Sequence, residues 1–108
     1  MIKVEFEKRS FKLISVKLKG HADSVDDGYD LVCCAVSVLS QSILIGLTEV
    51  LKFNVKYSID DGFLSFSLKG MSALHIEKCQ VLMETMLLGL KKIEFNYDKY
   101  ISISVKEV

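Results

Sequence analysis

Apolar and polar residues alternate over several short stretches of this 108-residue chain. Strict alternation is typical of strands that bury one face. The pattern predicts five strands, over residues 2–7, 11–19, 53–59, 64–68 and 100–105. Arg9-Ser10 is expected to connect the first two strands, and Asp60-Asp61-Gly62 is a strong hairpin turn between the third and the fourth.

Two longer segments have the composition and spacing of helices. Residues 31–51 are mostly apolar and follow Asp30, which is expected to be the N-cap. Ser72 is expected to cap a second helix over about residues 73–95, whose apolar residues form a helical stripe. The order ββαββαβ predicts an α+β fold, a two-layer α/β sandwich with two helices packed on a mixed β-sheet. Residues 1–108 are expected to form a single domain, because the length leaves no room for a second.

The first predicted helix is long enough to raise the question of a membrane span. Six polar residues interrupt it and no basic clusters flank it, so a central helix covered by the sheet and a partner is expected instead. Fourteen basic residues balance fourteen acidic ones, which provides no global field for nucleic acid or a membrane. With no signal-peptide pattern and two adjacent cysteines, we expect a cytoplasmic protein with reduced thiols.

Cys33 carries the clearest sign of chemistry. If Asp30 is the N-cap, Cys33 lies in the first helical turn, where unpaired N–H groups and the helix dipole favour a thiolate and supply donors for an oxyanion. Cys34 is then expected to face the core. Ser37, one turn after Cys33, is expected on the same face as that cysteine.

The segment from Gly20 to Tyr29 is polar, acidic and bracketed by glycines, so it is predicted to be a loop. It carries His21, twelve residues before Cys33, and a loop of this length can bring an imidazole beside the thiol. With a carboxylate nearby, a Cys-His pair has the nucleophile, base and orienting group that acyl transfer needs. The candidate carboxylates are Asp23, Asp26, Asp27 and Asp30.

Each of these residues also has a more common role. A cysteine in an apolar helix is more often small core filler, a loop histidine is usually solvated, and aspartates often serve turns and caps. A metal site is not expected because no CxxC or HxxxH spacing completes a ligand set, and no cofactor is expected either. Cys79 and His75, four residues apart on the second predicted helix, are interpreted as structural.

Two segments together resemble the signature of the ribosomal-processing cysteine protease family, Prp. The first is Gly20-His21-Ala22-Asp23, and the second runs Gly-Tyr-Asp-Leu-Val-Cys-Cys-Ala-Val-Ser from Gly28 to Ser37. The resemblance implies that Cys33 is the nucleophile and His21 the base, with Asp30 and Ser37 in supporting positions. Leu31 replaces the more usual Ile, and Cys34 stands where the family usually has a small residue such as Ala.

The resemblance also implies a function and a partner. Such proteases remove a short N-terminal extension from the twenty-seventh protein of the bacterial large ribosomal subunit, and the family is dimeric. Gly20, Asp23, Asp26, Asp27 and Gly28 are then expected to belong to a loop that orders over the substrate, with Gly20 and Gly28 as its hinges. Two alternatives remain: a non-enzymatic factor that binds ribosomal proteins or assists their assembly, and a redox sensor that uses Cys33 and Cys34.

Overall fold

Five strands and two long helices follow one another in the order ββαββαβ, as predicted. The computed structural model describes residues 1–20 and 27–108. Its elements are β1 (Ile2–Arg9), β2 (Lys12–Lys19), α1 (Asp27–Ile45), a π-helical turn η1 (Gly46–Val50), β3 (Lys56–Asp60), β4 (Phe63–Ser67), α2 (Ala73–Asn96) and β5 (Ile101–Glu107).

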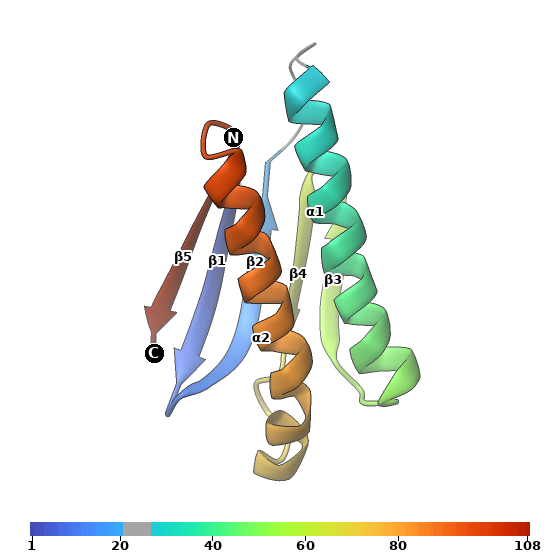
Figure 1. The fold of residues 1–108 in the computed structure, drawn as a ribbon. Coiled ribbons are helices and arrows are strands. Elements are labelled where there is room, and N and C mark those ends of the chain that lie inside the picture. The colour runs from blue at the N-terminus through green and yellow to red at the C-terminus, as the bar shows by residue number, and fades with distance from the viewer. Residues whose placement is uncertain (21–26) are drawn as a thin grey trace.

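The strands form one mixed sheet in the order β3-β4-β2-β1-β5. β5 pairs with β1 in parallel, and every other neighbouring pair is antiparallel. Both helices lie on the same face of the sheet (Figure 1). The predicted two-layer architecture is therefore confirmed.

Alternation along the strands builds the core between the two layers. On β1, Val4 and Phe6 are buried toward the helices while Glu5 between them is exposed. The two helices approach closely because glycine lies at their contact. A Cβ on Gly89 would sit 2.9 Å from the Leu39 side chain. The helix layer therefore has a fixed packing that holds α1 in place over the sheet.

Three local predictions concern turns and caps. Ser10 and Phe11 both have positive φ, and Arg9 pairs with Lys12, so the first turn is Ser10-Phe11 and the predicted Arg9-Ser10 is wrong by one residue. The second hairpin turns at Asp61-Gly62 with positive φ at the glycine. Ser72 caps α2 as predicted, since its hydroxyl accepts a hydrogen bond from the backbone N–H of His75.

The start of α1 differs from the prediction. The helix begins at Asp27, so residues 27–29 are helical rather than loop and Asp30 is its fourth residue rather than its N-cap. An aspartate at the first position is favoured by the positive end of the helix dipole. Sequence patterns fix helix ends poorly when several candidate N-cap residues stand in a row, as the run of aspartates does here.

Candidate active site

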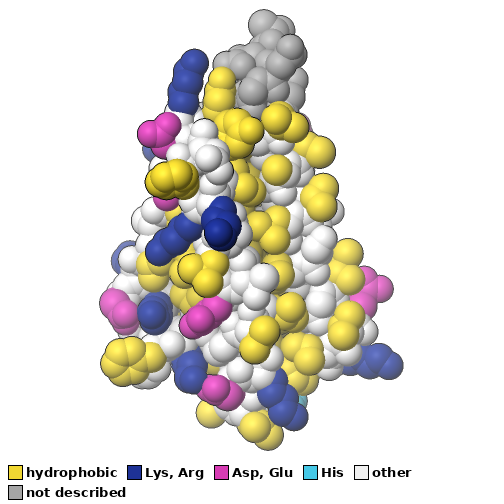
Figure 2. Space-filling view, viewed as in Figure 1, with side chains coloured by type: hydrophobic (Ala, Val, Ile, Leu, Met, Phe, Trp, Pro, Cys, Tyr) yellow, Lys and Arg dark blue, Asp and Glu magenta, His cyan; other side chains and the backbone are white. Residues whose placement is uncertain are grey.

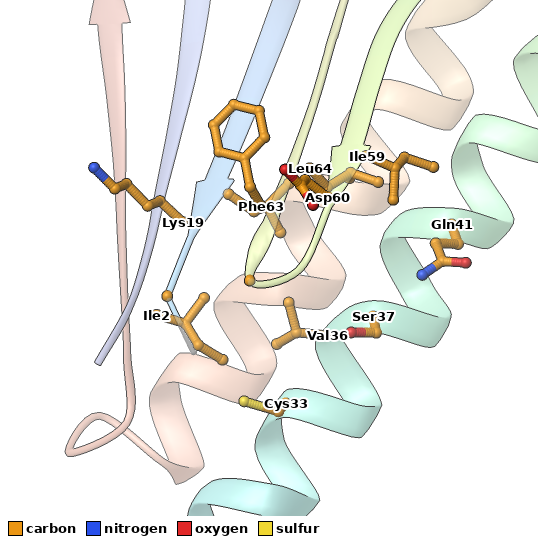
Figure 3. Close-up of a pocket in the computed structure, with 13 residues that line it drawn as sticks. Ile2, Lys19, Cys33, Val36, Ser37, Gln41, Ile59, Asp60, Phe63 and Leu64 are labelled. Atoms are coloured by element: carbon orange, nitrogen blue, oxygen red, sulfur yellow. The ribbon is translucent and has the colours of Figure 1, made fainter. Parts of the chain in front are cut away.

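A cavity of about 110 Å³ opens between α1 and the end of the sheet where β2 finishes and the β3–β4 hairpin turns. Cys33, Ser37 and Gln41 of α1 line one wall. Ile59, Asp60 and Phe63 of the hairpin line the facing wall (Figure 3). The cavity also contacts apolar residues of the sheet, among them Ile2, Leu18 and Leu64. It therefore has an apolar side and a row of polar helix residues next to one thiol.

The α1 wall follows from helix geometry. Cys33, Ser37 and Gln41 are spaced by four residues, so they stack along one side of the helix and follow one another into the cavity (Figure 3). We call this row the groove face of α1. Cys33 is half-buried and packs against the edge of the core, whereas Ser37 and Gln41 are exposed. The predicted proximity of Ser37 to Cys33 agrees with this arrangement.

Cys34 lies on a different side of α1. Its side chain is exposed, so the prediction that it faces the core is wrong. The core side of this part of the helix is formed by Val32 and Val36, and one further residue turns the side chain by about 100°. The two adjacent thiols therefore meet different surroundings: Cys33 opens into the cavity and Cys34 faces outward.

The helix dipole contributes less to Cys33 than predicted. Because α1 begins at Asp27, Cys33 is the seventh helical residue and lies in the second turn. The unpaired N–H groups belong to the first four residues, and the effect of the dipole falls off within the first turn. The prediction that the Cys33 region supplies free N–H donors is therefore wrong, because Cys33 lies beyond the residues with unpaired N–H groups.

Gly20 brings the chain to the cavity immediately before His21. It lines the cavity, and its N–H donates a 2.9 Å hydrogen bond to the carbonyl of Gly62 at the hairpin tip. A Cβ at this position would lie 2.7 Å from the Met1 carbonyl oxygen, so close backbone packing requires glycine here. The signature residue Gly20 therefore has a structural reason of its own, separate from the hinge role predicted for it.

The remaining predicted site residues fall into two groups. His21, Asp23 and Asp26 lie outside the described residues. Asp27, Gly28 and Asp30 lie in the first turn of α1, so the loop and hinge predicted at Gly28 are wrong. Of the predicted residues, the structure thus brings together Gly20, Cys33 and Ser37.

Cys79 and His75, which were interpreted as structural, are separated from this cavity. The thiol of Cys79 is completely buried in α2, and burial raises its pKa, so it is a poor source of thiolate. His75 stacks on the ring of Phe53 with the centroids 4.3 Å apart. It lies at the start of α2, which is at the opposite end of the helix layer from the start of α1 (Figure 1).

Sequence reasoning missed the hairpin wall and Gln41. The four-residue spacing from Cys33 through Ser37 points to Gln41, so this residue was accessible from helix geometry alone. Ile59, Asp60 and Phe63 reach the cavity through pairing of β4 with β2. A local pattern predicts their hairpin but does not show which helix it faces.

Comparison with known families identifies the class of protein. Residues 1–102 match the model of the family described as cysteine protease Prp. The chain belongs to this family. It is 31% identical over 98 residues to the ribosomal processing cysteine protease Prp of two Staphylococcus aureus strains, which covers 88% of this chain and 89% of each relative. It is therefore a cysteine protease of the ribosomal processing family, as the two sequence segments indicated.

Solved structures share the fold. SMU.848 from Streptococcus mutans has a TM-score of 0.90 and 32% identity, covering 100% of this chain and 96% of its own. The S. aureus Prp in complex with a covalently linked product peptide has a TM-score of 0.83 and 25% identity, covering 98% of this chain and 100% of its own. The same S. aureus protease in complex with a substrate peptide, at 24% identity and a TM-score of 0.85, supports the fold.

Proposed function

We propose that Cys33 is the nucleophile of this protease and that His21 is the base that activates it. The observation that carries this proposal is that Cys33 and Gly20, the residue before His21, line the same cavity. The chain has two histidines, and His75 lies at the far end of the helix layer. We therefore assign the role of base to His21, as the resemblance implies.

The reaction follows from this pair. The imidazole takes the Sγ proton, and the thiolate attacks the scissile carbonyl to form a tetrahedral oxyanion. The intermediate collapses as the imidazolium donates its proton to the leaving amine, which leaves a thioester on Cys33. Water activated by the same imidazole then hydrolyses the thioester. Asp30 and Ser37, at register positions within one turn of Cys33, are proposed to support the site.

The proposed substrate is the N-terminal extension of the twenty-seventh protein of the bacterial large ribosomal subunit. Two facts support it: the relatives are named ribosomal processing proteases, and an S. aureus relative carries a covalently linked product peptide. The run of acidic residues between His21 and Leu31 complements the basic body of a ribosomal protein. We place the reaction in the cytoplasm, where ribosomes mature and thiols stay reduced.

We further propose that the protein works as a homodimer joined through its helix layer. The outer face of α1, formed by Leu31, Cys34, Val38 and Ile45, is exposed. Hydrophobic side chains also gather along this helix in the space-filling view (Figure 2). A second copy of the same face would cover it in an isologous contact.

The lack of charged residues along α1, together with its packing, favours a protein partner of this kind. No charged residue occurs from position 31 to 48, and residues 31–50 are long and apolar enough to cross a membrane by length and composition alone. One side of the same helix is packed on the core and on α2, which leaves a single apolar stripe outside. A stripe on an otherwise packed helix suits a helix-to-helix contact better than insertion into lipid.

Mass spectrometry of the ribosomal protein with its extension tests the proposed function. The full-length protease is incubated with this substrate as wild type, Cys33→Ala and Cys34→Ala. We expect cleavage by wild type and Cys34→Ala, and a loss of more than about a thousandfold with Cys33→Ala, because the nucleophile is gone. Binding without cleavage by a folded, reduced wild type would instead support a non-enzymatic assembly factor.

A further inference from the structure

Strand β3 differs from the strand beside it in how much of its helix-side surface is covered. Ile59 pairs with Leu64, and Tyr57 pairs with Phe66, so each pair points to the same side of the sheet. Leu64 and Phe66 are 8% and 2% exposed, whereas Ile59 and Tyr57 are 51% and 59% exposed. The helix layer therefore leaves this surface of β3 largely uncovered, as an open strip along the strand.

The backbone of β3 is open as well. β3 is an edge strand that pairs only with β4. The β3–β4 hairpin turns through the two residues Asp61 and Gly62. Asp60 and Phe63, the pair that flanks this turn, therefore exchange main-chain hydrogen bonds, and so does every second pair after them along the hairpin. Tyr57 and Ile59 fall in the other pairs. Their N–H and C=O groups therefore point away from β4, toward the free edge.

At the opposite edge of the sheet, an outward backbone amide already has a hydrogen-bond partner. On β5, the backbone N–H of Ile103 donates a 2.8 Å hydrogen bond to the carboxylate of Glu94 on α2. No hydrogen bond within residues 1–20 and 27–108 reaches the outward amides of Tyr57 or Ile59 in this way. An edge strand with free main-chain groups is a template for another extended chain.

The open strip leads directly to the nucleophile. Ile59 and Asp60, at the end of β3, line the same cavity as Cys33. The groove face of α1 lies across from them, with the exposed Ser37 and Gln41 between the strand end and the thiol (Figure 3). A chain lying along β3 would therefore have one wall of main-chain groups and a second wall of polar helix side chains, and would end beside Cys33.

We propose that the peptide substrate binds as an added strand on the free edge of β3. Its main chain bonds to Tyr57 and Ile59, and its alternate side chains contact the exposed surfaces of those two residues. The ligand class is thus an extended, unfolded polypeptide segment, which is the state of a flexible N-terminal extension. This inference rests on the proposed function, because the strand leads the peptide to Cys33.

An N-methyl scan of a substrate peptide tests the added strand. The peptide spans the ribosomal extension, and one backbone amide at a time is methylated. We expect a period of two on one side of the cut: methylation of amides that face β3 lowers kcat/KM by roughly fivefold or more, and that of the amides between them has little effect. Methylation also adds bulk at every position, so the alternation is the decisive readout.

A variant of the protein gives an independent test. Tyr57→Pro removes the ring and the outward N–H, whereas Tyr57→Ala removes the ring alone. Proline is tolerated on an edge strand when its missing N–H faces outward, and thermal unfolding checks that both variants fold. We expect Tyr57→Pro to lower kcat/KM roughly fivefold below Tyr57→Ala, with an unchanged rate of Cys33 alkylation by iodoacetamide.

The outcomes separate the two proposals. Cleavage with no alternation in the scan, or equal activity of the proline and alanine variants, overturns the added strand and leaves the protease mechanism standing. No cleavage of the unmodified peptide overturns the proposed substrate and this inference with it.

Discussion

The groove face and the outer face of α1 are two exposed surfaces of one helix with different chemistry. The groove face, which borders the cavity, carries polar groups on Cys33, Ser37 and Gln41. The outer face, which looks away from the sheet, carries apolar Leu31, Val38 and Ile45. A third side of the helix, with the buried Val32 and Val36, covers the core, so the core does not need the exposed apolar residues of the outer face. This difference supports the proposal of two binding tasks on one helix, a peptide substrate on the groove face and a protein partner on the outer face.

The adjacent cysteines show how sharply the two faces divide. Cys33 is half-buried in the cavity and Cys34 is exposed on the outer face, although they are neighbours in sequence. A comparison of the thiols is therefore a comparison of the faces. Cys79, buried in α2, provides an internal reference that belongs to neither face.

The largest expected difference is between Cys79 and the α1 thiols. Complete burial excludes reagents and raises the pKa of Cys79, so alkylation requires opening of the fold. Both thiols are compared in the native protein at neutral pH, at a concentration where the proposed dimer is dissociated. We expect iodoacetamide to alkylate Cys79 more than about a thousandfold more slowly than Cys34. Peptide mapping after timed iodoacetamide labelling measures both rates. Comparable rates in native buffer would mean that α2 is not packed as described.

The second prediction concerns the proposed base. With His21 present, we expect labelling of Cys33 to persist well below the ordinary thiol pKa, because an imidazolium stabilises the thiolate. His21→Ala should lower the labelling rate of Cys33 near pH 6 by up to about a hundredfold and leave Cys34 unchanged. A pH series of labelling on both proteins measures this effect. An unchanged Cys33 profile would remove His21 from the mechanism.

A charge on the outer face should weaken the dimer. Val38→Glu places a carboxylate in the middle of the proposed contact, and we expect the dissociation constant to rise by about tenfold or more. Ser58→Glu adds the same charge at an exposed position of β3, on the face of the sheet that turns away from the helices, and should leave the dimer intact. Sedimentation analysis of both variants tests the assignment. Equal dissociation of the two, or a wild type that is monomeric, would contradict the proposed contact.

The smallest predicted effect compares two serines. Ser37→Ala removes a hydroxyl from the cavity, and we expect kcat/KM to fall by about three- to fivefold through loss of one hydrogen bond to the substrate or thiol. Ser42→Ala removes a hydroxyl from an exposed position outside the cavity and should change the rate little. Peptide cleavage assays on both variants give the ratio, and a larger loss with Ser42→Ala would reverse the assignment of the faces.

The sequence was sufficient for the order of elements because strand alternation and helix spacing are local properties. It was also sufficient to recognise the family, since the two signature segments lie close together in the chain, and to predict Cys33 as a candidate, which the structure places in a cavity. It was insufficient for the start of α1, because the sequence has aspartates at 26, 27 and 30 that are all candidate N-caps, and the choice of Asp30 gave Cys33 a helix-terminal environment that it does not have. The exposure of Cys34 was missed because α1 buries Val32 and Val36, which only packing reveals.

The hairpin wall was beyond local pattern for a related reason. Tyr57 and Ile59 alternate with polar residues as the residues of a half-buried strand do, yet both are more than half exposed. Their exposure follows from the position of β3 at the sheet edge and from a helix layer that leaves the surface of this strand uncovered. Strand order arises from pairing between distant segments, so it has no signature in the strand itself.

Acyl transfer to Cys33 is the central step of the proposed mechanism, and trapping the acyl-enzyme tests that step. A Cys34→Ala protein is mixed with the extended ribosomal substrate, quenched in acid during turnover and mapped by tandem mass spectrometry. We expect the N-terminal product, linked as a thioester, on the fragment that contains Cys33, and no adduct after Cys33→Ala in the same background. Turnover with no adduct on Cys33, or with an adduct that survives Cys33→Ala, would contradict the central claim.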